Sequence, residues 1–256
     1  MVEEQKDLAT TQGMMEVSQV KEAKDDLGFG ISDDNKELLI VPRAMLVQGG
    51  SPALKDPAAV CKFGDYINSI TKQVVGATFI PIAFSTNWIR FNGKTPSDPG
   101  FMPELEPGVI IWRATSKNDP AYIDAESVFG PNGEKPLAVQ FLNFLSYFPD
   151  SDQMMMVSFS KGSFKSGKEL FNMVRSQPGM PYAYQYKLGH VTKTGPSGDD
   201  YLMMTVTLNG KNVECYDKVN GMAKEFAAKI DRIVPHEEEE DTSFDTEDTS
   251  FDTEEM

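Results

Sequence analysis

The chain has 256 residues, 40% of them hydrophobic, which is enough to bury a sizeable core. Its formal net charge is −15, and its two cysteines and two histidines are too few for a disulfide framework or a zinc site, so we expect reduced thiols, no metal and no cofactor. No stretch approaches about 18 uninterrupted apolar residues and the N-terminus lacks the order of a signal peptide, so we expect a cytoplasmic protein without a membrane span.

The first elements predicted along the chain are a flexible arm, at residues 1–35, and then a series of strands. The most distinctive strand is 77–91, which is rich in β-branched and aromatic residues. Because proline cannot donate a ladder hydrogen bond, Pro81 places this strand at a sheet edge or at a bulge. The apolar segments predicted in chain order are 38–41, 63–70, 77–91, 109–113, 139–148, 154–159, 182–188 and 201–208.

Two helices are predicted among these strands. Residues 163–176 have helical composition, with an apolar face that ends before Pro178 and Gly179. Residues 213–233 carry apolar side chains at three- and four-residue steps, which predicts an amphipathic helix of about six turns. The last two strands, on either side of a Gly/Pro/Asp loop, are expected to form a long-armed hairpin.

The element order predicts a mainly β fold of α+β composition. Three strands, one helix and two strands follow the β-β-β-α-β-β order of a small Greek-key barrel, so our first interpretation is an OB-fold-like antiparallel barrel with an inserted helix and a C-terminal amphipathic helix. A less specific α+β domain on an antiparallel sheet is the alternative. We expect the barrel domain at 36–235, between the arm and a disordered acidic tail at 236–256.

The charge is divided unevenly along the chain. Residues 236–256 hold eleven acids and no Lys or Arg, whereas residues 98–152 hold nine acids against three bases. The segment 153–196 is the only basic region, and a polyanion site is expected to include it. Its cations are Lys161, Lys165, Lys168, Arg175, Lys187 and Lys193.

The tail consists largely of two exact copies of Asp-Thr-Ser-Phe-Asp-Thr-Glu, at 241–254. Its like charges repel, and its only large apolar groups are Phe244 and Phe251, so it cannot fold by itself. One interpretation is a tail that only confers solubility. The other is that each Phe inserts into a partner's apolar pocket rimmed by Lys or Arg, with the duplication raising the effective concentration of the motif.

An acidic tail with embedded Phe244 and Phe251, attached to a β-rich body, resembles the single-stranded DNA-binding proteins of bacteriophage replication systems. The segments 41–46 (Val-Pro-Arg-Ala-Met-Leu), 63–71 (Phe-Gly-Asp-Tyr-Ile-Asn-Ser-Ile-Thr) and 79–82 (Phe-Ile-Pro-Ile) also resemble such phage proteins. The resemblance implies binding of single-stranded DNA in the host cytoplasm. It also implies a tail that competes with DNA and recruits replication or recombination proteins. Bacterial members of the wider class end in an aromatic residue, whereas this chain ends in Met256.

Aromatic residues beside cations are further candidates for DNA contact, because bases stack on flat side chains while cations track phosphates. Such pairs occur near strand ends at Trp88 with Arg90 and at Trp112 with Arg113. The tyrosines at 182, 184 and 186 share one strand face and form either a stacking platform or part of the core. In the second case, Gln185 and Lys187 face solvent.

Residues 162–168 match the G-x-x-x-x-G-K spacing of a phosphate-cradling loop, between a predicted strand and a predicted helix. However, Glu169 stands where the motif needs Ser or Thr to hold magnesium. With no other catalytic constellation, we expect no enzyme. Our first hypothesis is a single-stranded DNA-binding protein without sequence preference. The alternatives are a structural or assembly protein of a virion and a degenerate nucleotide-binding enzyme. The oligomeric state is open.

Overall fold

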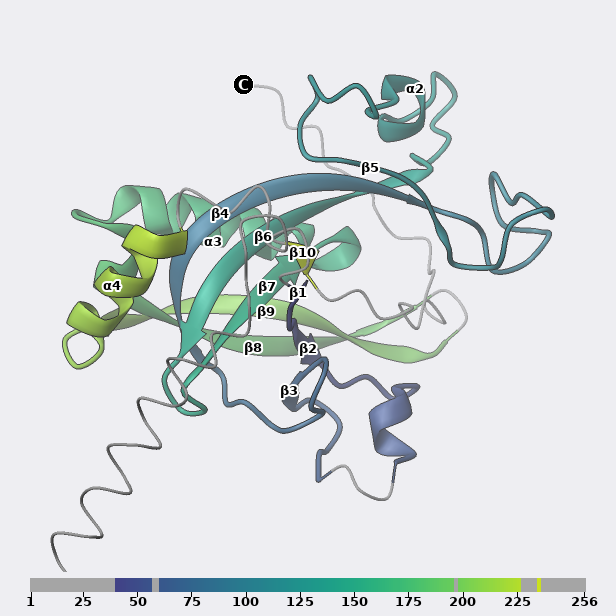
Figure 1. Ribbon diagram of the computed structural model, residues 1–256. Coiled ribbons are helices and arrows are strands. Elements are labelled where there is room, and N and C mark those ends of the chain that lie inside the picture. Colours follow the sequence, from purple (N-terminus) through teal and green to yellow (C-terminus); the bar gives the residue numbers. More distant parts are fainter. Residues whose placement is uncertain (1–39, 57–59, 196–197, 227–233, 236–256) are drawn as a thin grey trace, which may run out of the picture. The chain divides into compact units, whose positions relative to one another are not determined.

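The computed structural model describes residues 40–56, 60–195, 198–226 and 234–235 (Figure 1). The predicted arm and the acidic tail, including Phe244 and Phe251, lie outside these ranges. None of the helices that are described has the length and apolar character needed to cross a membrane.

The body is mainly β, and its main sheet is organised around one long strand, β4 (Thr78–Phe91). Along one edge, β4 pairs antiparallel with β6 (Ala138–Phe148), which in turn pairs antiparallel with β7 (Gln153–Phe159). The β4–β6 register shifts between Pro81 and Ala83, so the predicted bulge at the proline is confirmed. Figure 1 shows the resulting strong curvature of β4.

The other edge of β4 is shared by two strands. Its first residues pair with β8 (Tyr184–Thr194), and its last residues pair with β5 (Ile110–Ala114). The predicted hairpin is confirmed, because β8 pairs along its length with β9 (Asp200–Lys211). The order of strands is therefore β7-β6-β4-β8-β9, with β5 alongside the far end of β4.

Shorter elements surround this sheet. Two small strand pairs involve residues 40–48, which we call the N-terminal segment. β2 pairs antiparallel with β3, and β1 pairs parallel with β10. The short strands are β1 (Ile40–Val41), β2 (Ala44–Leu46), β3 (Tyr66–Asn68) and β10 (Val234–Pro235). The short helices are η2 (Pro52–Leu54), α2 (Asp124–Ser127), η3 (Lys161–Ser163) and η4 (Pro181–Ala183).

The sheet does not close into a barrel, so the predicted OB-fold is not confirmed, although the antiparallel, mainly β class is. Within the described residues β7 and β9 do not pair, and the N-terminal segment lies between them. On the β7 side, the Met156 amide donates to the Pro42 carbonyl at 2.8 Å. On the β9 side, the Gln48 side chain both donates to the Leu202 carbonyl and accepts from its amide, at 2.8 and 2.9 Å.

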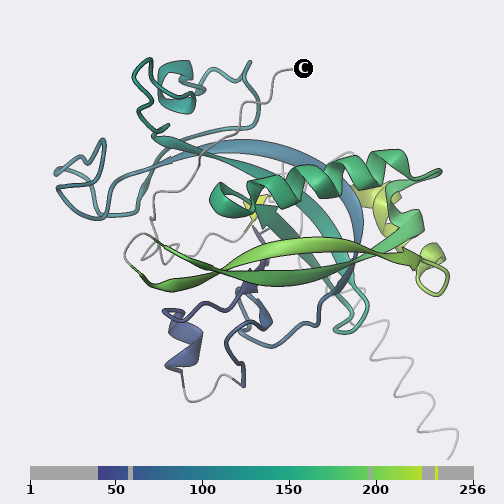
Figure 2. The same cartoon turned by 180° about the vertical axis from the view of Figure 1, so that it is seen from behind.

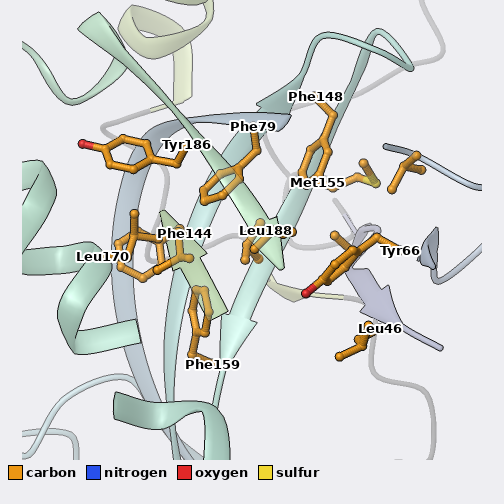
Figure 3. Packing of buried hydrophobic residues seen from close by; sticks show 14 of the residues in the cluster. Leu46, Tyr66, Phe79, Phe144, Phe148, Met155, Phe159, Leu170, Tyr186 and Leu188 are labelled. Atoms are coloured by element: carbon orange, nitrogen blue, oxygen red, sulfur yellow. The ribbon is translucent and has the colours of Figure 1, made fainter. Parts of the chain in front are cut away.

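The principal core lies between β4, β6 and β7 on one side and the β8–β9 hairpin on the other. Phe79, Phe144, Phe159 and Tyr186 are at most 1% exposed, and their rings contact one another or neighbouring rings (Figure 3). Burial of such aromatic side chains, each of which removes a large apolar area from water, is the main source of stability.

Two longer helices complete the body. The helix predicted at 163–176 is α3 (Phe164–Ser176), whose Leu170 is fully buried; Figure 2 shows α3 between the arc of β4 and the hairpin. The predicted closing helix is α4 (Tyr216–Phe226). It begins three residues later than predicted, because residues 213–215 are not helical, and 227–233 lie outside the described residues. Val219 and Ala223 of α4 pack on Ile80 and Ile82 of β4, on the face of the sheet opposite the principal core.

Candidate nucleic-acid interface

The exposed side of α3 carries a row of cations. Lys165, Lys168 and Arg175 are all exposed, whereas Ser166, Gly167 and Leu170 on the other side of the helix are buried. In an α-helix, residues three and seven apart lie on the same face, so these three cations form one stripe along the helix. We call Lys165, Lys168 and Arg175 the α3 stripe.

Two half-buried phenylalanine rings flank the α3 stripe. The Lys168 ammonium lies 5.1 Å from the centre of the Phe164 ring, and the Arg175 guanidinium lies 5.5 Å from the centre of the Phe171 ring. These are cation–π distances, in which the aromatic face holds the cation close to the helix surface. Phe164 and Phe171 were not among the residues predicted from the sequence, although the sequence contains the signal. Each Phe is followed by a cation four residues later, and the two pairs are seven residues apart.

The other predicted cations lie on neighbouring elements. Lys161 is exposed in η3, immediately before α3, while Lys187 and Lys193 are exposed on β8. Lys187 stands between two buried residues, Tyr186 and Leu188, so its side chain leaves the hairpin on the face opposite the core. All six cations of the basic segment are therefore accessible to solvent.

The tyrosines predicted as either a platform or core form part of the core. Tyr186 is fully buried, Tyr182 is 7% exposed in η4, and Tyr184 is half-buried. Burial, reinforced by the neighbouring Tyr184, raises the pKa of the Tyr186 hydroxyl to about 12. The expected alternation is confirmed at Lys187, which is exposed; Gln185 is half-buried.

The pairs Trp88 with Arg90 and Trp112 with Arg113 come together where β4 and β5 pair, but Trp88 and Arg90 are buried there. Trp112 and Arg113 are half-buried and, as neighbours on one strand, point to opposite faces of β5. Trp88 is 7% exposed and contacts the ring of Tyr122 edge-on, with centroids 5.4 Å apart. Arg113 is half-buried, and burial lowers the pKa of its guanidinium. A base or a phosphate cannot reach Trp88 in this arrangement.

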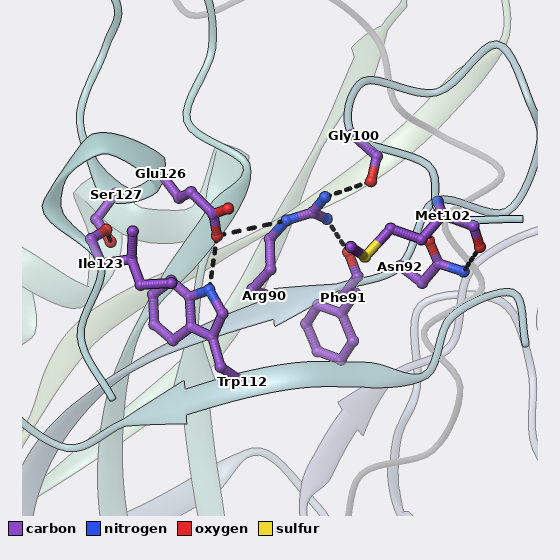
Figure 4. Close-up of polar contacts among 9 residues, drawn as sticks. All are labelled: Arg90, Phe91, Asn92, Gly100, Met102, Trp112, Ile123, Glu126 and Ser127. Carbon is purple, nitrogen blue, oxygen red and sulfur yellow. Dashed lines mark hydrogen bonds and ion pairs between the residues drawn. The ribbon is translucent and has the colours of Figure 1, made fainter. Parts of the chain in front are cut away.

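Arg90 joins the loops that follow β4 and β5 (Figure 4). Its guanidinium donates to the carbonyls of Phe91 and Gly100, and its Nε lies 3.8 Å from the Glu126 carboxylate. Burial lowers the pKa of Arg90, an effect that the charge of Glu126 opposes. Glu126 also accepts from the Trp112 Nε1 at 2.6 Å, so this cluster fixes α2 against the sheet.

The G-x-x-x-x-G-K segment has a different geometry from a phosphate-cradling loop. Such a loop presents its backbone N–H groups to phosphate, whereas here α3 begins at Phe164 and the residues up to Lys168 are helical. Gly167 is needed for close packing, since a Cβ there would lie 2.7 Å from the Phe159 Cβ and 3.0 Å from the Leu142 Cδ1. The second glycine of the motif thus has a structural explanation.

Comparisons with known proteins give one match. The model of a family described as "Pam3 phage gp34-like protein" matches residues 10–231. Neither the curated proteins nor the solved structures contain a match to this chain. The matched span takes in the main sheet, α3 and α4, and it ends before the acidic repeats.

Proposed function

The chain belongs to the Pam3 phage gp34-like family, and from this premise we propose that it is a phage single-stranded DNA-binding protein. In this proposal it coats replication or recombination intermediates without sequence preference. The exposed cations of the basic segment contact the phosphates, and the acidic tail competes with DNA and recruits partner proteins.

The observation that carries the proposal is the α3 stripe beside its two phenylalanine rings. Single-stranded nucleic acid is bound without sequence preference by cations that follow the backbone and by aromatic faces on which bases stack. Phe164 and Phe171 are half-buried and lie next to Lys168 and Arg175. The Phe171 ring also packs on Phe84, with centroids 4.7 Å apart. The surface therefore offers a row of cations beside two half-buried rings, with Lys161 at its beginning.

The strand order gives secondary support. The strand pairs match those of a five-stranded Greek-key barrel of the OB type, with the order β7-β6-β4-β8-β9 and with α3 between β7 and β8 in the chain. One pair differs: β7 and β9 do not pair with each other, and the segment that contains Pro42 and Gln48 lies between them. We therefore propose an OB-like fold with one open seam. OB-like domains commonly bind oligonucleotides.

The buried tryptophan and arginine cluster is left out of the proposed contact surface. Trp88 and Arg90 are 7% and 5% exposed, and the Arg90 guanidinium already donates to two main-chain carbonyls. The proposed role needs no catalytic group, so we propose that the protein is not an enzyme. It acts in the host cytoplasm, where phage DNA is replicated.

The test is a titration of a labelled oligo-dT with the full chain at several salt concentrations. If Lys161 and the three cations of the α3 stripe each neutralise one phosphate, log K falls with log salt with a slope of about −3. The slope reaches about −4 if Lys187 and Lys193, on the other face of the hairpin, also contact DNA. Deleting residues 236–256 tightens binding, because eleven acids no longer compete for the cations. A double-stranded oligonucleotide of the same length is the control ligand.

The charge-neutral variant Lys165→Gln/Lys168→Gln is expected to weaken oligo-dT binding and to make the salt slope shallower. Lys62→Gln/Lys224→Gln removes the same charge from other surfaces and serves as the matched control. Absence of salt-sensitive binding in both the full and the tail-less chain would refute the proposal and would favour the virion or assembly protein.

A further inference from the structure

The loop between β4 and β5 is held by buried side chains, chiefly that of Asn92, which is 2% exposed, with Arg90 donating to the Gly100 carbonyl at its beginning. The Asn92 Nδ2 lies 3.0, 3.0 and 3.1 Å from the carbonyl oxygens of Met102, Leu105 and Glu106, which share its two N–H donors, and its Oδ1 accepts from the Met102 main-chain amide at 2.8 Å. The main-chain N–H of Asn92 also donates to the Val109 carbonyl at 2.8 Å. We call residues 100–110, which Asn92 holds, the Asn92 loop.

This rigid loop presents apolar side chains to solvent. Met102, Leu105, Val109 and Ile110 are 37% to 40% exposed. Large apolar side chains gathered on an ordered surface mark interaction sites, and a loop already fixed in shape loses little conformational entropy when it binds. The Asn92 loop therefore has the properties of a docking surface.

The charges on the loop indicate what docks there. Glu104 and Glu106 are exposed on either side of Leu105, so the surface alternates acidic and apolar groups. The complementary surface must offer cations beside apolar groups. Within the described residues, the α3 stripe with Phe164 and Phe171 has this composition.

The loop and the helix of one chain do not satisfy each other's charges. In the described part of the chain, neither Glu104 nor Glu106 forms an ion pair with Lys165, Lys168 or Arg175. We infer that the Asn92 loop of one copy docks on the α3 stripe of a second copy. Its apolar side chains meet Phe164 and Phe171, and its two glutamates meet the cations.

This contact joins two different surfaces, so it is heterologous, and each copy keeps one free loop and one free helix. Repetition of the contact therefore produces chains of copies rather than closed dimers. The inference goes beyond the proposed function, because it concerns contacts between proteins in the absence of DNA. The two are linked in that both use the α3 stripe, for which the acidic tail of the proposed function also competes.

The test is sedimentation velocity of the full chain, without DNA, over a range of protein concentrations. We expect the sedimentation coefficient to rise with concentration at about 50 mM salt and much less at about 500 mM, where charges are screened beyond a few ångströms. Glu104→Lys/Glu106→Lys and Lys165→Glu/Lys168→Glu are each expected to weaken self-association about tenfold or more.

The decisive measurement mixes these two variants. Each variant is expected to associate poorly alone. In the mixture, the lysines of the Glu104→Lys/Glu106→Lys loop face the glutamates of the Lys165→Glu/Lys168→Glu helix, so association is recovered. The control Glu214→Lys/Glu225→Lys makes the same change of net charge on exposed residues around α4 and leaves association as in the original chain. All four positions in the loop and the helix are exposed, so the variants are expected to fold.

Three results would overturn the inference: a chain that stays monomeric at low salt, an equal loss in the Glu214→Lys/Glu225→Lys control, or no recovery on mixing. These results do not depend on DNA. Conversely, Glu104→Lys/Glu106→Lys retains every cation of the proposed DNA surface, so a loss of self-association with retained oligo-dT binding separates the two proposals.

Discussion

The β4–β5 junction and helix α3 both place cations beside aromatic rings, with opposite consequences. Where β4 meets β5, Arg90 lies near Trp112, is 5% exposed and donates to main-chain carbonyls of the adjoining segments. On α3, Lys168 and Arg175 lie over phenylalanine rings and remain exposed. The first arrangement holds the protein together, whereas the second leaves its charge available to a ligand.

The difference arises from the acceptors that the surroundings provide. A buried cation must be compensated, and Arg90 finds two carbonyls and the Glu126 carboxylate within reach. Lys168 and Arg175 of α3 lie over aromatic faces instead and remain exposed to solvent. The same pair of residue types can therefore be a structural clamp or a binding surface, and its neighbours decide which.

The largest expected effect comes from removing the buried cation. Arg90→Met leaves the carbonyls of Phe91 and Gly100 without their donor and Glu126 without its counter-charge, so the free energy of unfolding should fall by about 3 kcal/mol. Urea denaturation followed by circular dichroism measures this. Arg175→Met, on the exposed face of α3, is the control and should change stability by less than about 0.5 kcal/mol.

The structural role of Arg90 would be contradicted if Arg90→Met were as stable as the original chain and instead lost affinity for oligo-dT. That result would mean that the cluster opens to expose Arg90 to the ligand.

A smaller effect is expected from the inner side of α3. Gly167→Ala places a Cβ against Phe159 and Leu142 and should destabilise the protein by about 1–3 kcal/mol through overpacking, despite the better helix propensity of alanine. The matched control is Gly221→Ala in α4, where no atom lies within 4 Å of the added Cβ. There, the same substitution should stabilise the protein by about 0.5–1 kcal/mol.

Thermal unfolding of both glycine variants checks this pair. If Gly167→Ala raised the melting temperature as Gly221→Ala is expected to, α3 would not lie close against β7, and the glycine would need another explanation.

The smallest effect on stability is expected at Lys168. Lys168→Gln loses one exposed cation–π contact, so the free energy of unfolding should change by about 0.5 kcal/mol at most. In the oligo-dT titration, however, the same variant should make the salt slope shallower by about 0.7, the share of one phosphate contact. An unchanged slope would remove Lys168 from the proposed surface and would leave the cations of η3 and β8 together with Lys165 and Arg175 of α3.

The strands were predictable because their signal is local. The alternation of Ile80, Ile82 and Phe84 predicted β4 within one residue of its observed start, and Pro81 predicted the bulge. Closure of the barrel was not predictable in this way. It depends on whether two distant edges meet, and here the Gln48 side chain occupies the β9 edge, which no periodicity reveals.

The candidate site was predicted in part for a similar reason. Composition located the cations, and the structure finds them exposed. Composition alone could not distinguish Arg90 from Arg175, because each of these arginines lies near an aromatic residue in the sequence. The distinction depends on Glu126 and on the carbonyl of Gly100, which the chain brings to Arg90 only after folding. The role of Asn92 likewise depends on folding of the loop, which brings the carbonyls of Met102, Leu105 and Glu106 to its side chain.

The pairing of Gln48 with Leu202 also sets the order in which the protein can be completed during synthesis. The two residues are 154 positions apart. At about 5–20 residues per second, a ribosome needs roughly 10 to 30 s to make the chain between them. Until then the nascent segment around Gln48 has no β9 to bind, so this seam can form only after β9 has been made. Hydrogen exchange at the Leu202 amide reports directly on whether it has locked.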